Sequence, residues 1–268
     1  MTPHIPAVDS HAHVFDRSCR LVEGRRYTPG YEAPATRYVA VLKRAGVRHG
    51  VLVQPSFLGT DNACLLAALR RFPGTLRGVA VVAPQIADAE LEAMAAAGVR
   101  GIRYNLIGVD PAVPTQPEYR ALTRRVTRLG WLVEVQAAGA DLPGVLDTLT
   151  TDAATLVVDH FGRPGTAEPE ADPGFRKLLE FGPDGPVWVK LSAPYRLGGH
   201  DPAPFAAAFL DRLGPGRLLW GSDWPWTQHE AATSYGECVA AIGGWLGGDA
   251  DVRDRFDRAS RRLYGFGG

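Results

Sequence analysis

The sequence predicts a single-domain α/β protein, a distorted (β/α)8 barrel that spans residues 1–268. Three observations lead to this fold class. Short runs rich in β-branched residues recur eight times, and helix-like segments separate most of them. Several of those helix-like segments stop at glycine, which is a common helix end. Proline- and glycine-rich pieces at 107–117, 162–174 and 194–204 follow candidate strands, where the active-site loops of such barrels lie.

The candidate strands set the order of the barrel. They cover residues 5–15, 49–56, 76–84, 99–108, 131–139, 155–164, 187–195 and 217–225. The clearest helical segments are 36–47, 89–99, 118–130, 202–214 and 252–266. We expect Thr36 to cap the first of these helices, and Gly46, Gly98 and Gly130 to end the first three. The alternative is a doubly wound open sheet, which usually has a glycine-rich turn after its first strand, and residues 10–19 contain no such turn.

Composition narrows the function classes. The chain has 29 Lys and Arg against 29 Asp and Glu, so its formal net charge is zero and we expect no nucleic-acid partner. No run approaches the roughly 18 apolar residues of a membrane span, and the first ten residues do not resemble a signal peptide. Cys19, Cys64 and Cys238 are scattered and odd in number, which suggests neither a disulfide framework nor a thiolate metal site. We therefore expect a reduced cytoplasmic protein, as a monomer or a small homo-oligomer.

Two histidines one residue apart stand in the first candidate strand. Successive side chains of a strand point to opposite faces, so Asp9, His11 and His13 are expected to share one face. A polar face in an otherwise apolar segment needs a reason, because buried polar groups need partners, and a functional site is one such reason. The alternative is a solvated edge strand, in which the same pattern carries no function.

Polar residues recur at the expected carboxyl ends of the strands, which is the catalytic end of such barrels. They include His11, His13, Ser56, Arg103, Asn105, Glu134, Gln136, Asp159, His160, Arg163, Lys190, Ser192, Tyr195, Arg196 and Asp223. A barrel interior without a site is normally filled with branched apolar side chains, so this set predicts a site. For each arginine alone, a surface ion pair is an equal alternative, and His229 is expected to be solvated.

Three segments carry a resemblance to a known family. His11-x-His13 in the first strand, "VVDHFGRP" in the sixth and "WGSDWPW" in the eighth resemble the amidohydrolase superfamily. The match is closest to its lactonase branch, which includes hydrolases of pyrone dicarboxylates, sulfomuconolactones and sugar-acid lactones. "VQPSFLGTDN", "RGIRYNLIG", "VKLSAPYRL" and "RLYGF" also resemble that branch, so the similarity spans nearly the whole chain.

The resemblance implies a hydrolase that opens the ester of a small carboxylated lactone. Asp223 is then the base that activates water, and His11, His13 and His160 polarise the carbonyl group. The expected substrate-binding residues combine guanidinium groups for carboxylates with neutral helpers, and they are Ser56, Arg103, Asn105, Arg163, Lys190, Tyr195 and Arg196. Lys190 has a second interpretation, a buried ion pair with Asp159 or Glu134.

The same comparison addresses cofactor and substrate. Metal-dependent relatives usually place a histidine at the end of the fifth strand, where this chain has Gln136. We therefore expect no required cofactor, with a single zinc ion on His11, His13 and Asp223 as the alternative. Residues 106–109 lack an arginine that the branch uses for a second carboxylate, so a monocarboxylated or sugar-acid lactone fits as well as a pyrone dicarboxylate. Two other functions stay open: a zinc-dependent decarboxylase or amide hydrolase, and a sugar-acid binding protein without turnover.

Overall fold

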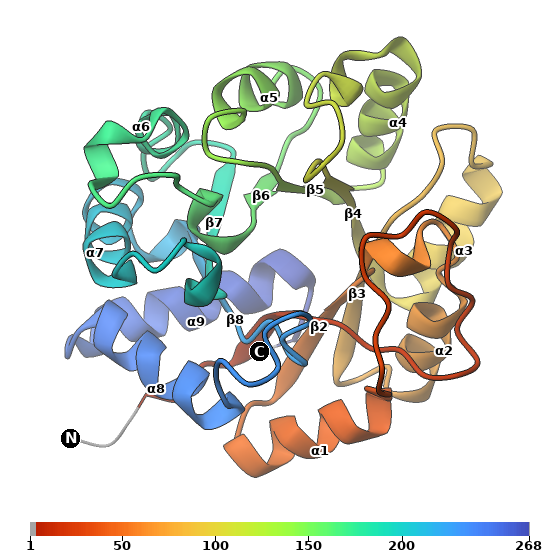
Figure 1. Cartoon of the computed structure of the whole chain (residues 1–268), viewed down its shortest axis with the longest axis horizontal. Helices are drawn as coiled ribbons and strands as arrows, with labels where there is room; N and C mark the ends of the chain where they lie inside the picture. Colours follow the sequence, from red (N-terminus) through yellow and green to blue (C-terminus); the bar gives the residue numbers. More distant parts are fainter. Residues whose placement is uncertain (1–3, 268) are drawn as a thin grey trace.

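The computed structural model describes residues 4–267 and contains eight parallel strands, each hydrogen-bonded to the next in chain order. The strands are β1 (Val8–Ala12), β2 (His49–Val53), β3 (Leu76–Ala80), β4 (Val99–Asn105), β5 (Leu132–Gln136), β6 (Leu156–Val158), β7 (Val187–Ser192) and β8 (Leu218–Gly221). They form a ring with the helices outside it, as Figure 1 shows. The expected (β/α)8 barrel is confirmed, and all eight candidate runs contain a strand.

Helices follow the strands around the outside of the ring. They are α1 (Ala35–Ala45), α2 (Ala63–Arg71), α3 (Asp88–Ala97), α4 (Pro117–Arg128), α5 (Leu142–Leu149), α6 (Pro173–Leu179), α7 (Pro202–Leu213), α8 (Tyr235–Leu246) and α9 (Ala250–Tyr264). Gly46 and Gly98 end α1 and α3 in the left-handed conformation, as expected. The expected cap at Thr36 is wrong: the helix begins one residue earlier, after Pro34, and no side chain caps it.

The ring closes between β8 and β1, directly below the candidate site. The Asp223 amide donates to the His11 carbonyl at 2.8 Å, and the His13 amide donates to the Trp224 carbonyl at 2.7 Å. Gly221 permits this closure, because a Cβ built on it would lie 2.5 Å from the His11 Cβ. The seam therefore fixes both histidines of the H-x-H motif against the carboxylate-bearing turn after β8.

The expectation that Asp9 shares a face with the two histidines is wrong. The pairing register of β1 with β2 shifts between Asp9 and Ala12, which reverses the alternation along the strand. Asp9 instead points to the outer helices, where its carboxylate accepts from Ser222 Oγ at 2.6 Å and from Tyr235 Oη of α8 at 3.1 Å. It is a structural link between the seam and α8.

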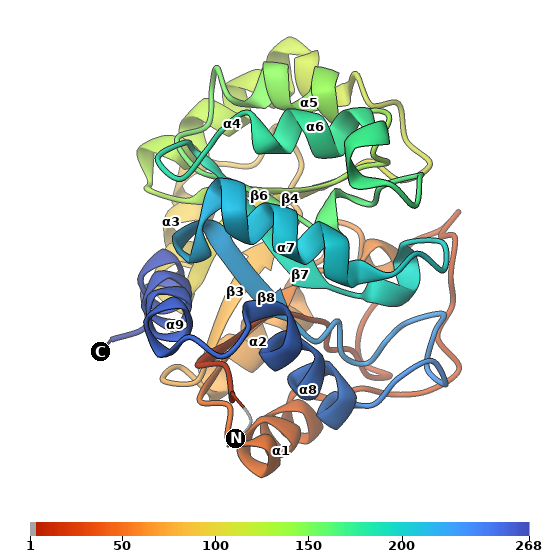
Figure 2. The same cartoon turned by 90° about the vertical axis from the view of Figure 1, so that its left-hand side faces the viewer.

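The barrel interior is layered. Its lower layer is apolar, contains Val51, Val157 and Leu219, and is closed from below by Tyr264 and Phe266 at the end of the chain. Figure 2 shows α9 at this end and the long loops at the opposite end. Above the apolar layer the inward side chains become polar and charged, and the candidate site lies on top of them. A second apolar cluster fills the space between strands and helices.

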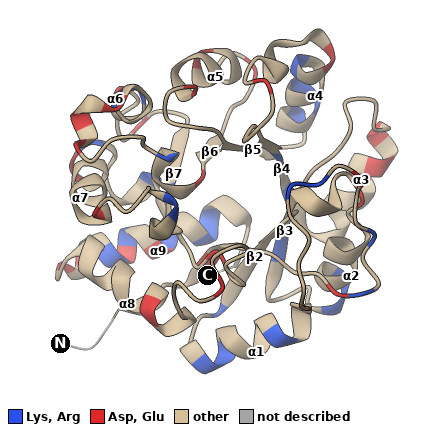
Figure 3. Ribbon diagram, viewed as in Figure 1, with Lys and Arg blue, Asp and Glu red and all other residues tan. Residues whose placement is uncertain are grey.

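The surface and the cysteines complete the fold. Figure 3 shows both signs of charge on the outer helices. Within residues 4–267, none of the helices combines the length and apolar character that a membrane span requires. Cys19 and Cys64 form a disulfide, with Cα atoms 5.8 Å apart. The expectation of unpaired cysteines is therefore wrong, because the loop after β1 folds back onto the start of α2. The expectation of a reduced, cytoplasmic protein loses its support with it.

Candidate active site

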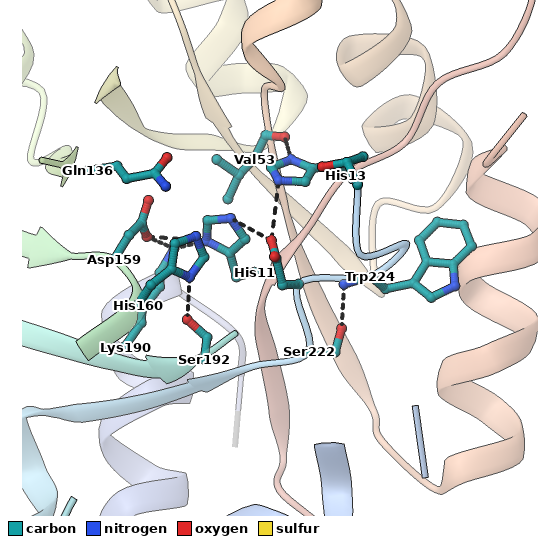
Figure 4. Close-up of polar contacts among 12 residues, drawn as sticks. His11, His13, Val53, Gln136, Asp159, His160, Lys190, Ser192, Ser222 and Trp224 are labelled. Carbon is teal, nitrogen blue, oxygen red and sulfur yellow. Dashed lines mark hydrogen bonds and ion pairs between the residues drawn. The ribbon is translucent and has the colours of Figure 1, made fainter. Parts of the chain in front are cut away.

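A cavity of about 370 Å³ opens at the carboxyl ends of the strands. Among the expected site residues, the structure brings the following together around it: His13, Ser56, Arg103, Asn105, His160, Arg163, Tyr195, Arg196 and Asp223. His11 and Lys190 are fully buried just beneath the floor of the cavity and do not line it. Figure 4 shows how His11, His13 and His160 converge from β1 and from the turn after β6.

Several residues at the floor of the cavity have strained backbone conformations. His160, Arg163 and Asp223 have φ values of 53°, 49° and 56°, in the left-handed region that side chains other than glycine rarely adopt. Each such residue costs about 1–3 kcal/mol, and such residues cluster at functional sites, where the surrounding structure holds them. The tight turns after β6 and after β8 bend inward, so that these side chains point into one cavity.

Asp223 is the central carboxylate. Its Oδ2 accepts from Tyr195 Oη at 2.6 Å and from Arg196 Nε at 3.0 Å. Its Oδ1 is buried and has no hydrogen-bond partner among the described residues, with His11 Nε2 and His13 Nε2 each 3.5 Å away. Burial alone would raise the pKa of Asp223, but the Arg196 guanidinium and the adjacent histidines hold it well below the usual range. Asp223 is therefore ionised, with one oxygen free to act.

Two of the histidines around Asp223, His11 and His160, are neutral. Burial lowers the pKa of His160 to about 3, and its Nδ1 lies 2.8 Å from Ser192 Oγ. Burial and the Lys190 ammonium together hold the pKa of His11 well below its usual value. His13 is anchored through Nδ1, which donates to the Val53 carbonyl at 2.8 Å. His11 and His160 can therefore act as hydrogen-bond donors or acceptors without carrying charge.

A charged network lies beneath the floor. Lys190 Nζ lies 3.2 Å from Asp159 Oδ1 and also contacts Glu134, so both ion pairs that were expected as alternatives for Lys190 are present. Arg103 donates to Asp159 Oδ2 at 2.7 Å and to Gln136 Oε1 at 2.7 Å. Burial opposes ionisation of Asp159, yet these cations hold its pKa well below normal, whereas burial and Asp159 raise the pKa of Glu134. Arg103 thus reaches the cavity with much of its donor capacity already used.

Two other arginines face the cavity without an anionic partner. Arg163 and Arg26 form no ion pair or side-chain hydrogen bond with any residue in the described part of the chain. Burial, and then the charges of Arg196 and Arg26, lower the pKa of Arg163. A half-buried, unpaired guanidinium favours an anionic ligand, and carboxylates suit its planar donors.

Sequence reasoning missed several residues of the cavity wall. They are Arg26 and Tyr27 from the loop after β1, and Thr227, Gln228 and His229 from the loop after β8. His229 was expected to be solvated, but it packs against the Tyr195 ring, with centroids 4.7 Å apart. Arg26 lies beside Gly108, with its Cδ 3.5 Å from where a glycine Cβ would be. Arg26 stands beside Arg25 in a loop, and nothing in the local sequence distinguishes it from a surface arginine.

The metal expectation can be tested on donor chemistry. One ligand atom each from His11, His160 and Asp223 lies within 4.8 Å of the others, and His11 Nε2 and Asp223 Oδ1 are buried without partners. These groups converge as zinc ligands would, and His160 takes the place of His13 in the expected set of His11, His13 and Asp223. However, Lys190 Nζ lies 3.0 Å from His11 Nδ1, and an ammonium has only donors. It places the His11 proton on Nε2, so the site as built does not offer a free His11 Nε2 to a metal.

Comparisons with known proteins agree with the geometry. The amidohydrolase family model matches residues 8–266. A 2-pyrone-4,6-dicarboxylate hydrolase of Comamonas testosteroni is 34% identical over 235 residues, which cover 82% of this chain and 76% of that protein. A crystal structure described as a 2-pyrone-4,6-dicarboxylic acid hydrolase from Pseudomonas putida is 44% identical, with a TM-score of 0.88 over 98% of each chain. Another so described, from Acinetobacter baumannii with citric acid bound, is 34% identical, with a TM-score of 0.89 over 98% of this chain and 100% of that one. The chain therefore belongs to the amidohydrolase family.

Proposed function

We propose that the protein is a lactonase-type hydrolase that opens the ester of a small carboxylated lactone, with Asp223 activating the attacking water. One observation carries this proposal: an ionised, buried carboxylate has one oxygen without a hydrogen-bond partner among residues 4–267. It lies at the floor of a cavity whose Arg26 and Arg163 are likewise unpaired within that range. A carboxylate in that position is a general base, and the arginines supply the grip on an anionic substrate.

The chemistry follows from the contacts of Asp223. Tyr195 and Arg196 hold Oδ2, so Oδ1 is the oxygen that takes a proton from water. The water oxygen bonds to the lactone carbonyl carbon, and the developing oxyanion is stabilised by donors at the floor, among which neutral His160 is placed to act. The ring C–O bond then breaks, and the proton on Asp223 passes to the ring oxygen that leaves. The product is a hydroxy acid or, where the ring oxygen is enolic, an enol acid that tautomerises to the keto acid.

The cavity also limits the substrate. A volume of about 370 Å³ admits a single small ring with its substituents. Arg163 and Arg26 are the cavity cations without carboxylate partners in the described chain, so they are free to bind substrate carboxylates, with Ser56, Asn105 and Tyr195 as neutral neighbours. Citric acid bound to the Acinetobacter baumannii relative supports a carboxylate ligand. Because His11 does not present a free Nε2 to a metal, we propose that turnover needs no cofactor.

Lactone hydrolysis, followed by proton release in weak buffer, tests the proposal. The panel contains the pyrone dicarboxylate, muconolactones, and aldonic and uronic lactones, each with and without chelator. Turnover of at least one lactone should survive chelation, and Asp223→Asn should lower kcat by about 10²–10⁴-fold, the usual contribution of a general base. Asp211→Asn, on the exposed face of α7, is the matched control and should leave kcat unchanged.

Other outcomes would overturn it. Activity that appears only after zinc is added would favour a metal-dependent hydrolase or decarboxylase. Binding of lactones without consumption, with affinity unchanged in Asp223→Asn, would favour a binding protein.

A further inference from the structure

Lys190 occupies an unusual place for a lysine, fully buried beneath the floor of the cavity. Its Nζ has three neighbours: Glu134 Oε2 at 2.5 Å, His11 Nδ1 at 3.0 Å and Asp159 Oδ1 at 3.2 Å. An ammonium group has three N–H donors and no acceptor. Lys190 Nζ is hydrogen-bonded to Glu134 and His11, and its contact with Asp159 is an ion pair. One of the three partners is an imidazole nitrogen, which must therefore accept.

The proton of His11 is assigned by this contact. If Nδ1 carried the proton and donated to Asp159 Oδ1, 3.2 Å away, its N–H would also face the Lys190 ammonium at 3.0 Å, donor against donor. With Lys190 charged beside Asp159 and Glu134, the favourable form of neutral His11 has its proton on Nε2. That nitrogen points to Asp223 Oδ1, 3.5 Å away.

His13 is held in the opposite neutral tautomer. Its Nδ1 faces the Val53 carbonyl at 2.8 Å, and a carbonyl oxygen only accepts, so Nδ1 carries the proton. The Nε2 lone pair of His13 then faces Asp223 Oδ1 at 3.5 Å, from the wall of the cavity. The two histidines of one H-x-H motif thus present unlike groups to the same carboxylate oxygen.

We propose that Lys190 is a positioning residue that fixes the tautomer of His11 and so makes His11 a hydrogen-bond donor instead of a metal ligand. The N–H of His11 faces Asp223 Oδ1 at 3.5 Å without a hydrogen bond to it. The lone pair of His13 together with Oδ1 offers two acceptors to the two hydrogens of one water molecule. This use in turnover rests on the proposed lactonase function, whereas the tautomers themselves do not.

Removal of the ammonium should reverse the assignment. Without Lys190, His11 Nδ1–H can donate to Asp159 Oδ1 at the 3.2 Å already present, which frees Nε2. In zinc sites, the histidine nitrogen that does not bind the metal usually donates its N–H to a carboxylate. Lys190→Met should therefore gain zinc affinity on His11, His160 and Asp223.

The tautomers are measured directly in the wild-type protein. Imidazole ¹⁵N labelling and long-range ¹H–¹⁵N correlation spectra distinguish the two neutral forms, and His11→Asn and His13→Asn assign the signals. We expect the Nε2–H form for His11 and the Nδ1–H form for His13. An Nδ1–H form or an imidazolium at His11 would overturn the proposal, whatever the enzyme hydrolyses.

Zinc binding gives the second measurement. Lys190→Met, or Lys190→Met/Glu134→Gln if the single variant does not fold, should switch His11 to the Nδ1–H form. It should also bind zinc at least about 10-fold more tightly than the wild type, the usual size of such effects. Lys177→Met is the matched control, since Lys177 pairs with Asp147 at 2.9 Å and Glu180 at 3.0 Å on the surface. Equal zinc affinity in variant and wild type would refute the role of Lys190.

Discussion

Replacement of Arg196 by glutamine should move the acid limb of the pH profile. Arg196 Nε lies 3.0 Å from Asp223 Oδ2 and, after the opposing effect of burial, is the largest influence on the Asp223 pKa, which it holds well below the ordinary 3.8. An aspartate that loses an adjacent arginine rises in pKa by about 1–3 pH units. Because Asp223 must be ionised to accept a proton, activity falls as the pH drops through its pKa. The limb of kcat/KM should therefore shift to higher pH by about 1–3 units in Arg196→Gln.

Replacement of Tyr195 provides a second, smaller shift with which the Arg196→Gln shift can be compared. Its hydroxyl donates to the same Oδ2 at 2.6 Å but carries no charge. Tyr195→Phe should therefore raise the limb by less than Arg196→Gln, by about half as much or less, since hydrogen bonds from charged groups are roughly twice as strong as neutral ones. Arg217→Gln, at the opposite end of the barrel, should leave the limb in place.

The assay is kcat/KM for a hydrolysed lactone at constant ionic strength, from about pH 2 to about pH 8, a range that extends well below the ordinary carboxyl pKa. Circular dichroism at each pH separates acid unfolding from loss of ionisation. If the limb in Arg196→Gln coincides with that of the wild type while KM rises, Arg196 binds substrate and does not set the Asp223 pKa. The reasoning from the 3.0 Å contact would then be refuted.

Two further predictions concern the loop after β1. Arg26→Gln should raise KM for a carboxylated lactone about 3- to 10-fold with little change in kcat, because an exposed ion pair is worth about 1 kcal/mol; Arg20→Gln, in the same loop but away from the cavity, should not. Reduction of Cys19–Cys64, 45 residues apart, should lower the free energy of unfolding by up to about 4 kcal/mol, seen as a lower Tm with reductant. Cys19→Ser should melt at that lower Tm and no longer respond to reductant, and a wild-type Tm insensitive to reductant would contradict the prediction.

Much of the architecture was readable from local pattern. Each of the eight apolar runs became a strand, because β-branched residues between helix-like segments favour a parallel sheet. The five expected helices, α1, α3, α4, α7 and α9, were found, whereas α2, α5, α6 and α8 were missed. Of these, α5 and α6 contain Pro and Gly near their starts and give weak signals. His13, His160, Arg163 and Asp223 were found for the same reason, since parallel strands bring their carboxyl ends to one edge.

Contacts between residues distant in the chain could not be predicted from local sequence patterns. The alternation rule placed Asp9 with the histidines, but one register shift in β1 turned it outward to Ser222 and Tyr235. The rule also placed Lys190 with the substrate-binding residues, whereas its long side chain ends under the floor, between Glu134 and Asp159. The alternation along a strand predicts the face on which a side chain lies. It does not predict how deeply a charged end is buried or which residue that end contacts.

The sequence by itself therefore determined the barrel, the edge that carries the chemistry and most of the residues at its floor, because these depend on short-range periodicity and on the geometry of parallel strands. The tertiary structure alone decided the disulfide, the arrival of Arg26 and His229 at the cavity, and the contact of Lys190 with His11. These depend on the paths of long loops and on side chains that meet across 45 to 179 residues of chain. No local pattern encodes such meetings, since they form only when the whole barrel closes.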